Sequence, residues 1–236
     1  MLGLLDAIHL RRRIKLLDDQ SVAFRRKYGT SQSRVILFLP WGLSIERAEF
    51  LRLLPASYFS CYETPQGIVS STPRIPVDSL TGLEKAFQDD LGTVGNAGRK
   101  PLLIGMSMGN FPATYLANKH GLDLISIASG HSGDWLTFNS PAASHIRSKA
   151  ESAGLSQSDF TGLIAPLSPV NHLAHLGSGS QFIFGTYDHY IPKQSREILI
   201  ARLGKERPDI PITKVPLGHL ATIVLWKFLV RAYEDS

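Results

Sequence analysis

Uninterrupted apolar runs alternate along this chain with segments in which apolar residues recur every three or four positions. Residues 34–39 (RVILFL) form one such run, which is typical of a strand buried on both faces, and Pro40 ends it. Residues 78–91 place leucine and phenylalanine at spacings of three and four, which predicts an amphipathic helix. Strands that alternate with helices need crossover connections, so we expect a doubly wound, mostly parallel α/β sheet.

Further apolar runs and periodic segments follow the same pattern. We expect strands at residues 34–39, 58–64, 100–106, 123–129, 180–186 and 211–216. We expect helices within residues 41–54, at 78–91, 110–120 and about 144–153, after Lys193, and from about Leu220 to Tyr233. Polar sequence at about residues 131–174 interrupts the alternation, which predicts a short lid-like insertion at the rim of the sheet. The chain has no internal repeat or low-complexity linker, so its 236 residues are predicted to form one domain.

A lone serine stands where one of these strands should meet its helix, in the stretch PLLIGMSMGN at residues 101–110. In a doubly wound sheet, ligands bind beyond the carboxyl ends of the strands, which is where Ser107 falls. Gly105 and Gly109 flank it two residues away, and a sharp strand-to-helix turn favours glycine there because a side chain would collide with the chain. The pattern G-x-S-x-G predicts an exposed nucleophilic serine, although a small packing residue would fit the same letters.

Two further candidates follow later strands, in the order serine, acid, histidine that this kind of catalytic triad requires. Asp188 follows a predicted strand in FIFGTYDHYIP, and His219 follows the next strand in PLGHLATIVLW. With these motifs the chain resembles the α/β hydrolase superfamily from about residue 34 onward. The segment GTYDHYIP resembles the acid loop of that family, and LGHL resembles its histidine loop. The resemblance implies the α/β hydrolase fold.

The resemblance also implies a role for each candidate. Ser107 would be the nucleophile and His219 the base that removes its proton. Asp188 would fix the tautomer of the imidazole and stabilise its protonated form. Some members of the family carry the acid after the preceding strand, so Asp134 in ASGHSGDW is the alternative to Asp188.

An oxyanion hole needs N–H donors beside the nucleophile, and one expected donor is the backbone of Met108, the residue after the serine. The loop LPWGLS resembles the HGWG-like oxyanion loop of the family. It carries Pro40 where histidine often stands, and one glycine is missing. By that match the second donor is Trp41, with Gly42 as the next choice.

These motifs predict a serine hydrolase that cleaves an ester, thioester or related acyl bond through an acyl-enzyme. Apolar side chains near the serine are expected to form the pocket for the acyl group of a small-molecule substrate. They are Trp41, Met106, Met108, Trp135 and Phe138. An acyltransferase that uses the same triad is one alternative, and a non-catalytic binding protein of the same fold is another.

The net charge of +5 comes largely from arginine and lysine near the start of the chain. No aromatic residues interleave with the basic run at residues 11–13, so no nucleic-acid partner is expected. Residues 1–20 or so are predicted to form a basic helical segment whose apolar residues precede its charges, the reverse of a secretory signal, so we expect it in the mature protein. No later apolar stretch is long enough to insert across a membrane. Nothing in the sequence indicates an oligomeric state.

The one cysteine, Cys61, is most simply a buried thiol, and the lack of a cysteine framework favours a reducing, cytoplasmic compartment. His172 with His175, and His131 with Asp134, stand three residues apart, as metal ligands can. No H-E-x-x-H motif or cysteine ligand accompanies them, so we expect no metal. Glycine-rich phosphate loops are also missing, and no nucleotide cofactor is expected.

Overall fold

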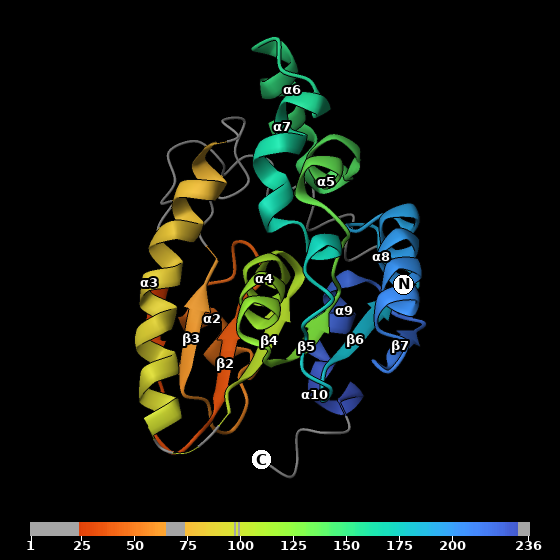
Figure 1. Ribbon diagram of the computed structural model, residues 1–236. Helices are drawn as coiled ribbons and strands as arrows, with labels where there is room; N and C mark the ends of the chain where they lie inside the picture. The colour runs from red at the N-terminus through yellow and green to blue at the C-terminus, as the bar shows by residue number, and fades with distance from the viewer. Residues whose placement is uncertain (1–23, 65–73, 97, 99, 231–236) are drawn as a thin grey trace.

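The computed structural model describes residues 24–64, 74–96, 98 and 100–230, whose strands form one sheet (Figure 1). The seven described strands follow the order β1-β3-β2-β4-β5-β6-β7. They are β1 (Arg25–Tyr28), β2 (Val35–Phe38), β3 (Ser60–Glu63), β4 (Leu102–Met106), β5 (Asp123–Ile127), β6 (Gln181–Gly185) and β7 (Ile212–Val215). Neighbouring strands pair in parallel except β1 and β3, which are antiparallel. The mostly parallel sheet and all the strands expected from the apolar runs are confirmed.

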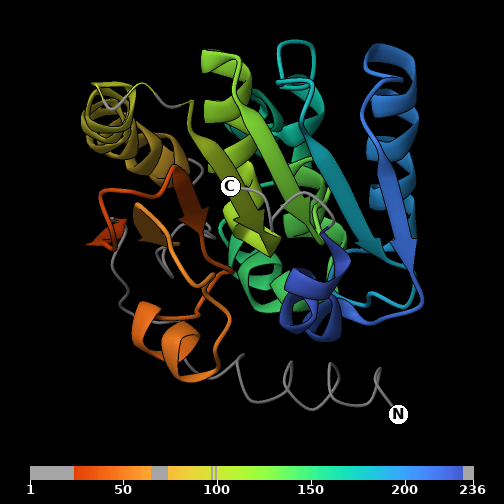
Figure 2. The same ribbon diagram turned by 90° about the horizontal axis from the view of Figure 1, so that it is seen from below.

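Helices cover both faces of this sheet, as the doubly wound arrangement requires. The described helices are α2 (Ile45–Phe50), α3 (Arg74–Asn96), α4 (Asn110–His120), α5 (Gly133–Asn139), α6 (Ser144–Ser152), α7 (Gln157–Ile164), α8 (Lys193–Glu206), α9 (His219–Val224) and α10 (Trp226–Leu229). The 3₁₀ turns are η3 (Ser107–Gly109), η4 (Pro141–Ala143), η5 (Ala165–Leu167) and η6 (Pro169–Asn171). Figure 2 shows α3, α4 and α8 on one face and α2, α9 and α10 on the other. In Figure 1 the helices α5, α6 and α7 lie above the end of the sheet.

The apolar runs of the sequence become strands because both of their faces are buried. Successive side chains of β2 point to opposite faces of the sheet, so Ile36 and Phe38 pack with α3 and α4, whereas Val35 and Leu37 pack with α2 and α9. All four side chains are almost fully buried. If polar and apolar residues alternated along the strand, polar side chains would be buried in the apolar core on one face of the sheet. This explains why the apolar runs of the strands are uninterrupted.

Strand β1, with the sequence RRKY, was not expected from the sequence, since it contains no apolar run. It is an edge strand whose basic side chains pair with acidic groups. Arg26 donates to the carboxylate of Asp90, which is fully buried and also accepts hydrogen bonds from Ser60 (2.5 Å) and Tyr62 (2.6 Å). The two flanking basic residues of β1 form ion pairs with glutamates of α2 and β3. This part of the basic cluster is therefore held in the fold by specific ion pairs.

Two elements differ from the sequence-based prediction. The single final helix expected from about Leu220 to Tyr233 is divided at Leu225 into α9 and α10, and residues beyond Val230 lie outside the described part. The side chain of Trp226 is fully buried there and donates to the carbonyl of Leu53 at 2.9 Å, which fixes the turn between the two helices. The insertion contains α5 and α7 in addition to the expected α6. The start of α7 carries a capping box between Ser156 and Asp159, a signal that was present in the sequence.

Cys61 is fully buried in β3, as expected, and burial raises the pKa of its thiol. The predicted basic helical segment at about residues 1–20 lies outside the described residues. In the described part of the chain, no helix has the length and apolarity that crossing a membrane requires.

Candidate active site

The chain turns sharply between β4 and α4, and Ser107 stands at the turn. Its φ is 53°, in the left-handed region that a residue with a side chain rarely adopts. Such a conformation costs about 1–3 kcal/mol and needs surrounding structure to hold it. A Cβ on Gly105 would lie 2.8 Å from the Cα of Asn110, and one on Gly109 would lie 2.3 Å from the carbonyl oxygen of Phe38. Both glycines are therefore required by the close approach of α4 to the sheet.

We expect Gly109→Ala to lower the free energy of unfolding by at least about 2 kcal/mol, because the added methyl group would collide with the backbone of β2. Chemical denaturation followed by circular dichroism measures this value. Gly204→Ala in α8 is the matched control, since no atom lies within 4 Å of its added Cβ. The control should be neutral or stabilising by up to about 1 kcal/mol. Equal stability of the two variants would contradict the steric requirement at the turn.

The side chain of Asn110, the first residue of α4, binds backbone carbonyls at this turn. This residue was not singled out in the sequence. Its side chain is fully buried, and its amide group donates to the carbonyl of Ser107 (3.0 Å) and to that of Ile127 at the end of β5 (2.7 Å). These bonds anchor the strained serine to the neighbouring strand. The signal available in the sequence was a polar amide directly after the G-x-S-x-G motif.

The structure brings Ser107, His219 and Asp188 together from the loops that follow β4, β7 and β6. The Nε2 atom of His219 lies 2.8 Å from Oγ of Ser107, and its Nδ1 atom lies 2.7 Å from Oδ2 of Asp188. All three residues are buried, with exposed fractions of 8% for Ser107, 3% for His219 and 5% for Asp188. The imidazole therefore bridges a hydroxyl and a carboxylate away from bulk water.

The loop after β6 fixes the carboxylate of Asp188. Its Oδ1 atom accepts hydrogen bonds from the backbone N–H groups of Tyr190 and Ile191, both at 2.8 Å. These two bonds hold one carboxylate oxygen in place and leave the other directed at His219. The ring of Tyr190 also stacks on His219, with centroids 4.7 Å apart and planes inclined by 15°. The loop thus holds the histidine from two sides, through the carboxylate and through the aromatic ring.

The alternative acid, Asp134, lies elsewhere. It is on α5, and its Oδ2 atom accepts a hydrogen bond from the hydroxyl of Thr161 on α7 at 2.8 Å. This bond joins two helices of the insertion. The carboxylate in contact with His219 is that of Asp188.

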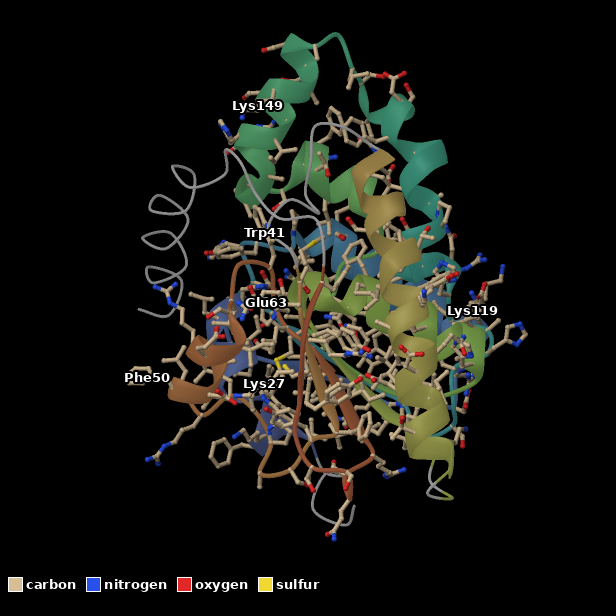
Figure 3. The ribbon with its side chains drawn as sticks, turned by 90° about the vertical axis from the view of Figure 1, so that its left-hand side faces the viewer. Lys27, Trp41, Phe50, Glu63, Lys119 and Lys149 are labelled. Carbon is tan, nitrogen blue, oxygen red and sulfur yellow. The ribbon has the colours of Figure 1, made fainter. Side chains whose placement is uncertain are left out.

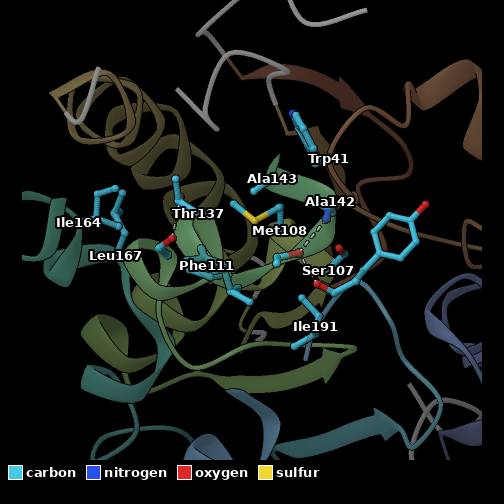
Figure 4. Close-up of a pocket in the computed structure, with 14 residues that line it drawn as sticks. Trp41, Ser107, Met108, Phe111, Thr137, Ala142, Ala143, Ile164, Leu167 and Ile191 are labelled. Atoms are coloured by element: carbon cyan, nitrogen blue, oxygen red, sulfur yellow. Dashed lines mark hydrogen bonds between the residues drawn. The ribbon is translucent and has the colours of Figure 1, made fainter. Parts of the chain in front are cut away.

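Trp41 lies in the loop after β2, above the sheet and below the insertion that carries Lys149 (Figure 3). The turn there is closed by a hydrogen bond from the N–H of Leu43 to the carbonyl of Pro40 at 3.1 Å, with Gly42 at a φ of 68°. Met108 lies in η3, directly after the serine. Both Trp41 and Met108 line a cavity next to Ser107 (Figure 4).

This cavity has a volume of about 80 Å³ and an almost entirely apolar wall. Figure 4 shows Ser107 toward one side and Ile164 and Leu167 toward the opposite side, so the cavity runs from the serine beneath the insertion. Beyond the serine it is lined by side chains from α4, α5, η4, α7 and η5, chiefly Phe111, Leu136, Thr137, Ala143, Ile164 and Leu167.

The pocket residues expected from the sequence are only partly correct. Trp41 and Met108 line the cavity, whereas Met106, Trp135 and Phe138 do not. Met106 is the last residue of β4 and packs into the core on the α2 and α9 side of the sheet. Phe138 packs against Phe160, whereas Trp135 packs against His131 and against the outside of the apolar cluster that includes Leu136. Other residues of α5 line the cavity.

Comparisons with known proteins were made at the level of sequence and of structure. No family model matches the chain, and the search of curated proteins finds no match. Among solved structures, an esterase from Pyrococcus furiosus matches 89% of this chain and 88% of its own, with 11% identity and a TM-score of 0.56. A hydrolase from Pseudomonas aeruginosa matches 90% of this chain and 94% of its own, with 14% identity and a TM-score of 0.52. This chain has the α/β hydrolase fold.

The α/β hydrolase fold serves more than one reaction among these neighbours. An acylaminoacyl peptidase from Pyrococcus horikoshii matches 83% of this chain and 35% of its own, with 11% identity and a TM-score of 0.54. Esterase and peptidase thus share the arrangement of strands and helices found here. The function must therefore be argued from the site itself.

The histidines with metal-ligand spacing have separate partners in this α/β hydrolase fold. His172 contacts the carbonyl of Pro166 through Nε2 at 2.7 Å, and His131 contacts the hydroxyl of Ser195 through Nδ1 at 2.9 Å. Burial lowers the pKa of both imidazoles. Within residues 24–64, 74–96, 98 and 100–230, no three histidine, cysteine or acidic side chains gather in a group that could hold a metal ion.

Proposed function

We propose that this protein is a serine hydrolase that cleaves an ester, thioester or related acyl bond by forming a covalent acyl-enzyme at Ser107. The observation that carries the proposal is the position of the His219 imidazole, 2.8 Å from the serine hydroxyl and 2.7 Å from the carboxylate of Asp188. A neutral serine hydroxyl is a weak nucleophile, and a base at hydrogen-bond distance is what activates it. We also propose that the whole chain forms a single catalytic domain, in which residues 131–174 are a lid over the site.

The reaction would proceed in two steps. The Oγ atom of Ser107 attacks the carbonyl carbon while Nε2 of His219 takes its proton. When the tetrahedral intermediate collapses, the same proton passes to the leaving oxygen or sulfur, and the alcohol or thiol departs. Water then loses a proton to Nε2 as it attacks the acyl-enzyme, and the proton returns to Ser107 as the acid is released. Asp188 keeps the proton of the neutral imidazole on Nδ1 and stabilises the imidazolium in each step.

The oxyanion of each intermediate would be stabilised by the backbone N–H groups of Met108 and Trp41. Met108 follows the nucleophile in the 3₁₀ turn, Trp41 lies in the loop after β2, and both residues line the cavity next to Ser107. Each donor of this kind contributes roughly 3 kcal/mol to the stability of the transition state.

The cavity supports an apolar acyl group of limited length. A water-sized group needs about 10–15 Å³ of such space, so a cavity of about 80 Å³ accepts roughly five to eight groups of that size. We expect kcat/KM for p-nitrophenyl esters to be highest at acyl chains of about four to eight carbons and at least tenfold lower for palmitate. Steady-state kinetics across a series of chain lengths measures this preference.

Two variants of equal volume change test the assignment of the cavity. Ala143→Phe fills part of it and should move the preference toward acetate. Ala201→Phe, on the exposed surface of α8, should leave the preference unchanged. An identical chain-length profile in both variants would remove this cavity from substrate binding.

The proposal is tested directly with a fluorophosphonate probe, which forms a covalent bond to an activated serine as fluoride leaves. The wild-type protein should be labelled at Ser107, and Ser107→Ala should not be labelled. Ser140 lines the same cavity but donates to the carbonyl of Tyr190 (2.6 Å), so Ser140→Ala should still be labelled. An unlabelled wild-type protein would overturn the proposal and favour the non-catalytic alternative. Product analysis with an added alcohol separates hydrolysis from acyl transfer.

Two further expectations belong to this proposal. We expect a cytoplasmic enzyme, since its one cysteine is buried and takes part in no disulfide among the described residues. We also expect no nucleic-acid partner, because the basic residues of β1 already pair with acidic groups of the same chain.

A further inference from the structure

The first turn of α8 contains an arginine whose guanidinium is buried against the loop that carries Asp188. The Nη1 atom of Arg196 donates to the carbonyls of Asp188 (2.8 Å) and Ile191, and its Nη2 atom donates to that of Thr186 (3.1 Å). The residue is 6% exposed. One side chain therefore holds three carbonyl groups of residues 186–191.

This position is unfavourable for a cation. Burial lowers the pKa of Arg196, and the carboxylate of Asp188 is the main group that opposes the shift. The positive end of the α8 dipole disfavours a cation in the first turn as well. Within the described residues Arg196 forms no ion pair. Its hydrogen bonds go to neutral backbone carbonyls. A neutral side chain would avoid these costs but could not supply a fork of donors.

Residues 186–191, whose carbonyls bind Arg196, form the acid loop, and both contacts with His219 described above come from this loop. Its carbonyl groups bind the guanidinium, while its N–H groups at Tyr190 and Ile191 bind Oδ1 of Asp188. The other carboxylate oxygen contacts His219, and the ring of Tyr190 stacks on the same imidazole. Movement of this loop would therefore displace the carboxylate and the ring together.

We propose that Arg196 is a positioning residue that keeps the loop of residues 186–191 in the shape that directs Asp188 at His219. It is not among the residues that line the cavity, and its hydrogen bonds go to the acid loop. Its part in turnover rests on the proposed function, whereas its effect on the contact between Asp188 and His219 does not. Loss of the guanidinium should weaken the orientation of the imidazole and leave the acyl pocket in place.

The test compares Arg196→Met, which keeps an unbranched apolar side chain, with Arg196→Lys, which keeps the charge but presents one compact donor group instead of a fork. Arg202→Met is the matched control, since Arg202 is an exposed residue of the same helix that pairs with half-buried Glu206. Three quantities are measured: the low-field proton NMR resonance of Nδ1–H in His219, kcat and KM for a short-chain ester, and the thermal unfolding midpoint.

We expect Arg196→Met to lose or shift the low-field resonance and to lower kcat by up to about 10²-fold, with KM within about twofold of wild type. Arg196→Lys should give an intermediate resonance and at least about a fivefold loss of kcat, while Arg202→Met should match the wild type. A simple loss of folded protein would lower the active fraction but would not shift the resonance of the molecules that remain folded.

A wild-type resonance together with wild-type kcat in Arg196→Met would overturn the proposal. If that variant does not fold, Arg196→Lys decides, and an unchanged resonance and kcat in the lysine variant would also overturn it. If the fluorophosphonate probe does not label the wild-type protein, the proposed function fails, and the resonance alone decides the role of Arg196.

Discussion

Replacing His219 by alanine should lower kcat/KM for a short-chain ester by about 10⁴- to 10⁶-fold, and replacing Ser107 by alanine should lower it by a similar factor. The imidazole is the group within hydrogen-bond distance of the serine hydroxyl that can accept its proton, and the cavity wall around it is apolar. Without the base, the hydroxyl stays protonated and attack on the carbonyl becomes very slow. Steady-state kinetics, together with far-UV circular dichroism of each variant, measures the effect.

Two comparisons sharpen this prediction. The double variant Ser107→Ala with His219→Ala should be no slower than either single variant, because the two groups act as one unit. His189→Ala changes an exposed histidine in the same loop as Asp188 and should keep nearly full activity. Activity of His219→Ala within about tenfold of the wild type would exclude it as the base.

Asp188→Asn should lower kcat by about 10⁴-fold, whereas Asp134→Asn should lower it by less than about tenfold. The amide that replaces the carboxylate of Asp188 would favour the wrong tautomer of His219 and could not stabilise the imidazolium. At Asp134 the amide oxygen can still accept the hydrogen bond from Thr161, so the link between α5 and α7 should persist. Because the same chemical change is made twice in one fold, the comparison isolates the contact with the histidine.

The low-field proton resonance of Nδ1–H in His219 gives an independent readout of the two variants. Asp188→Asn should lose or shift this resonance, because the carboxylate in contact with Nδ1 is removed. Asp134→Asn should leave it in place. A larger rate loss in Asp134→Asn than in Asp188→Asn would reverse the assignment of the acid.

The strands were predictable because burial on both faces demands runs such as that at residues 34–39. Strand β1 was not, since RRKY is stable at the edge only through contacts such as that of Arg26 with Asp90, which is distant in the sequence. The division of the last helix likewise depends on the place of Trp226 in the core. A local sequence pattern shows which segments are buried on both faces, but it does not show contacts between residues that are distant in the sequence.

The residues of the candidate site also differ in how far the sequence alone could predict them. Ser107 could be predicted as the candidate nucleophile because the tight turn around it requires glycine on both sides, and these glycines are visible in the sequence. The contacts of Asn110 and Arg196 could not be predicted, because they depend on the position of the neighbouring strand β5 and on the path of the loop at residues 186–191. Met106 lies outside the pocket because side chains alternate along β4, which directs its last residue into the core on the α2 and α9 side of the sheet.

The far wall of the cavity belongs to the chain between β5 and β6, whereas Ser107, Asp188 and His219 belong to loops fixed at the edge of the sheet. Under the proposed function, the groups that react and the residues that would contact the acyl chain are therefore encoded in separate stretches of the gene. We then expect that exchanging residues 131–174 for an insertion of another shape would give a chimera with new selectivity and the same proton transfers. A serine hydrolase of this design could diversify by replacing one insertion while its catalytic residues stay the same.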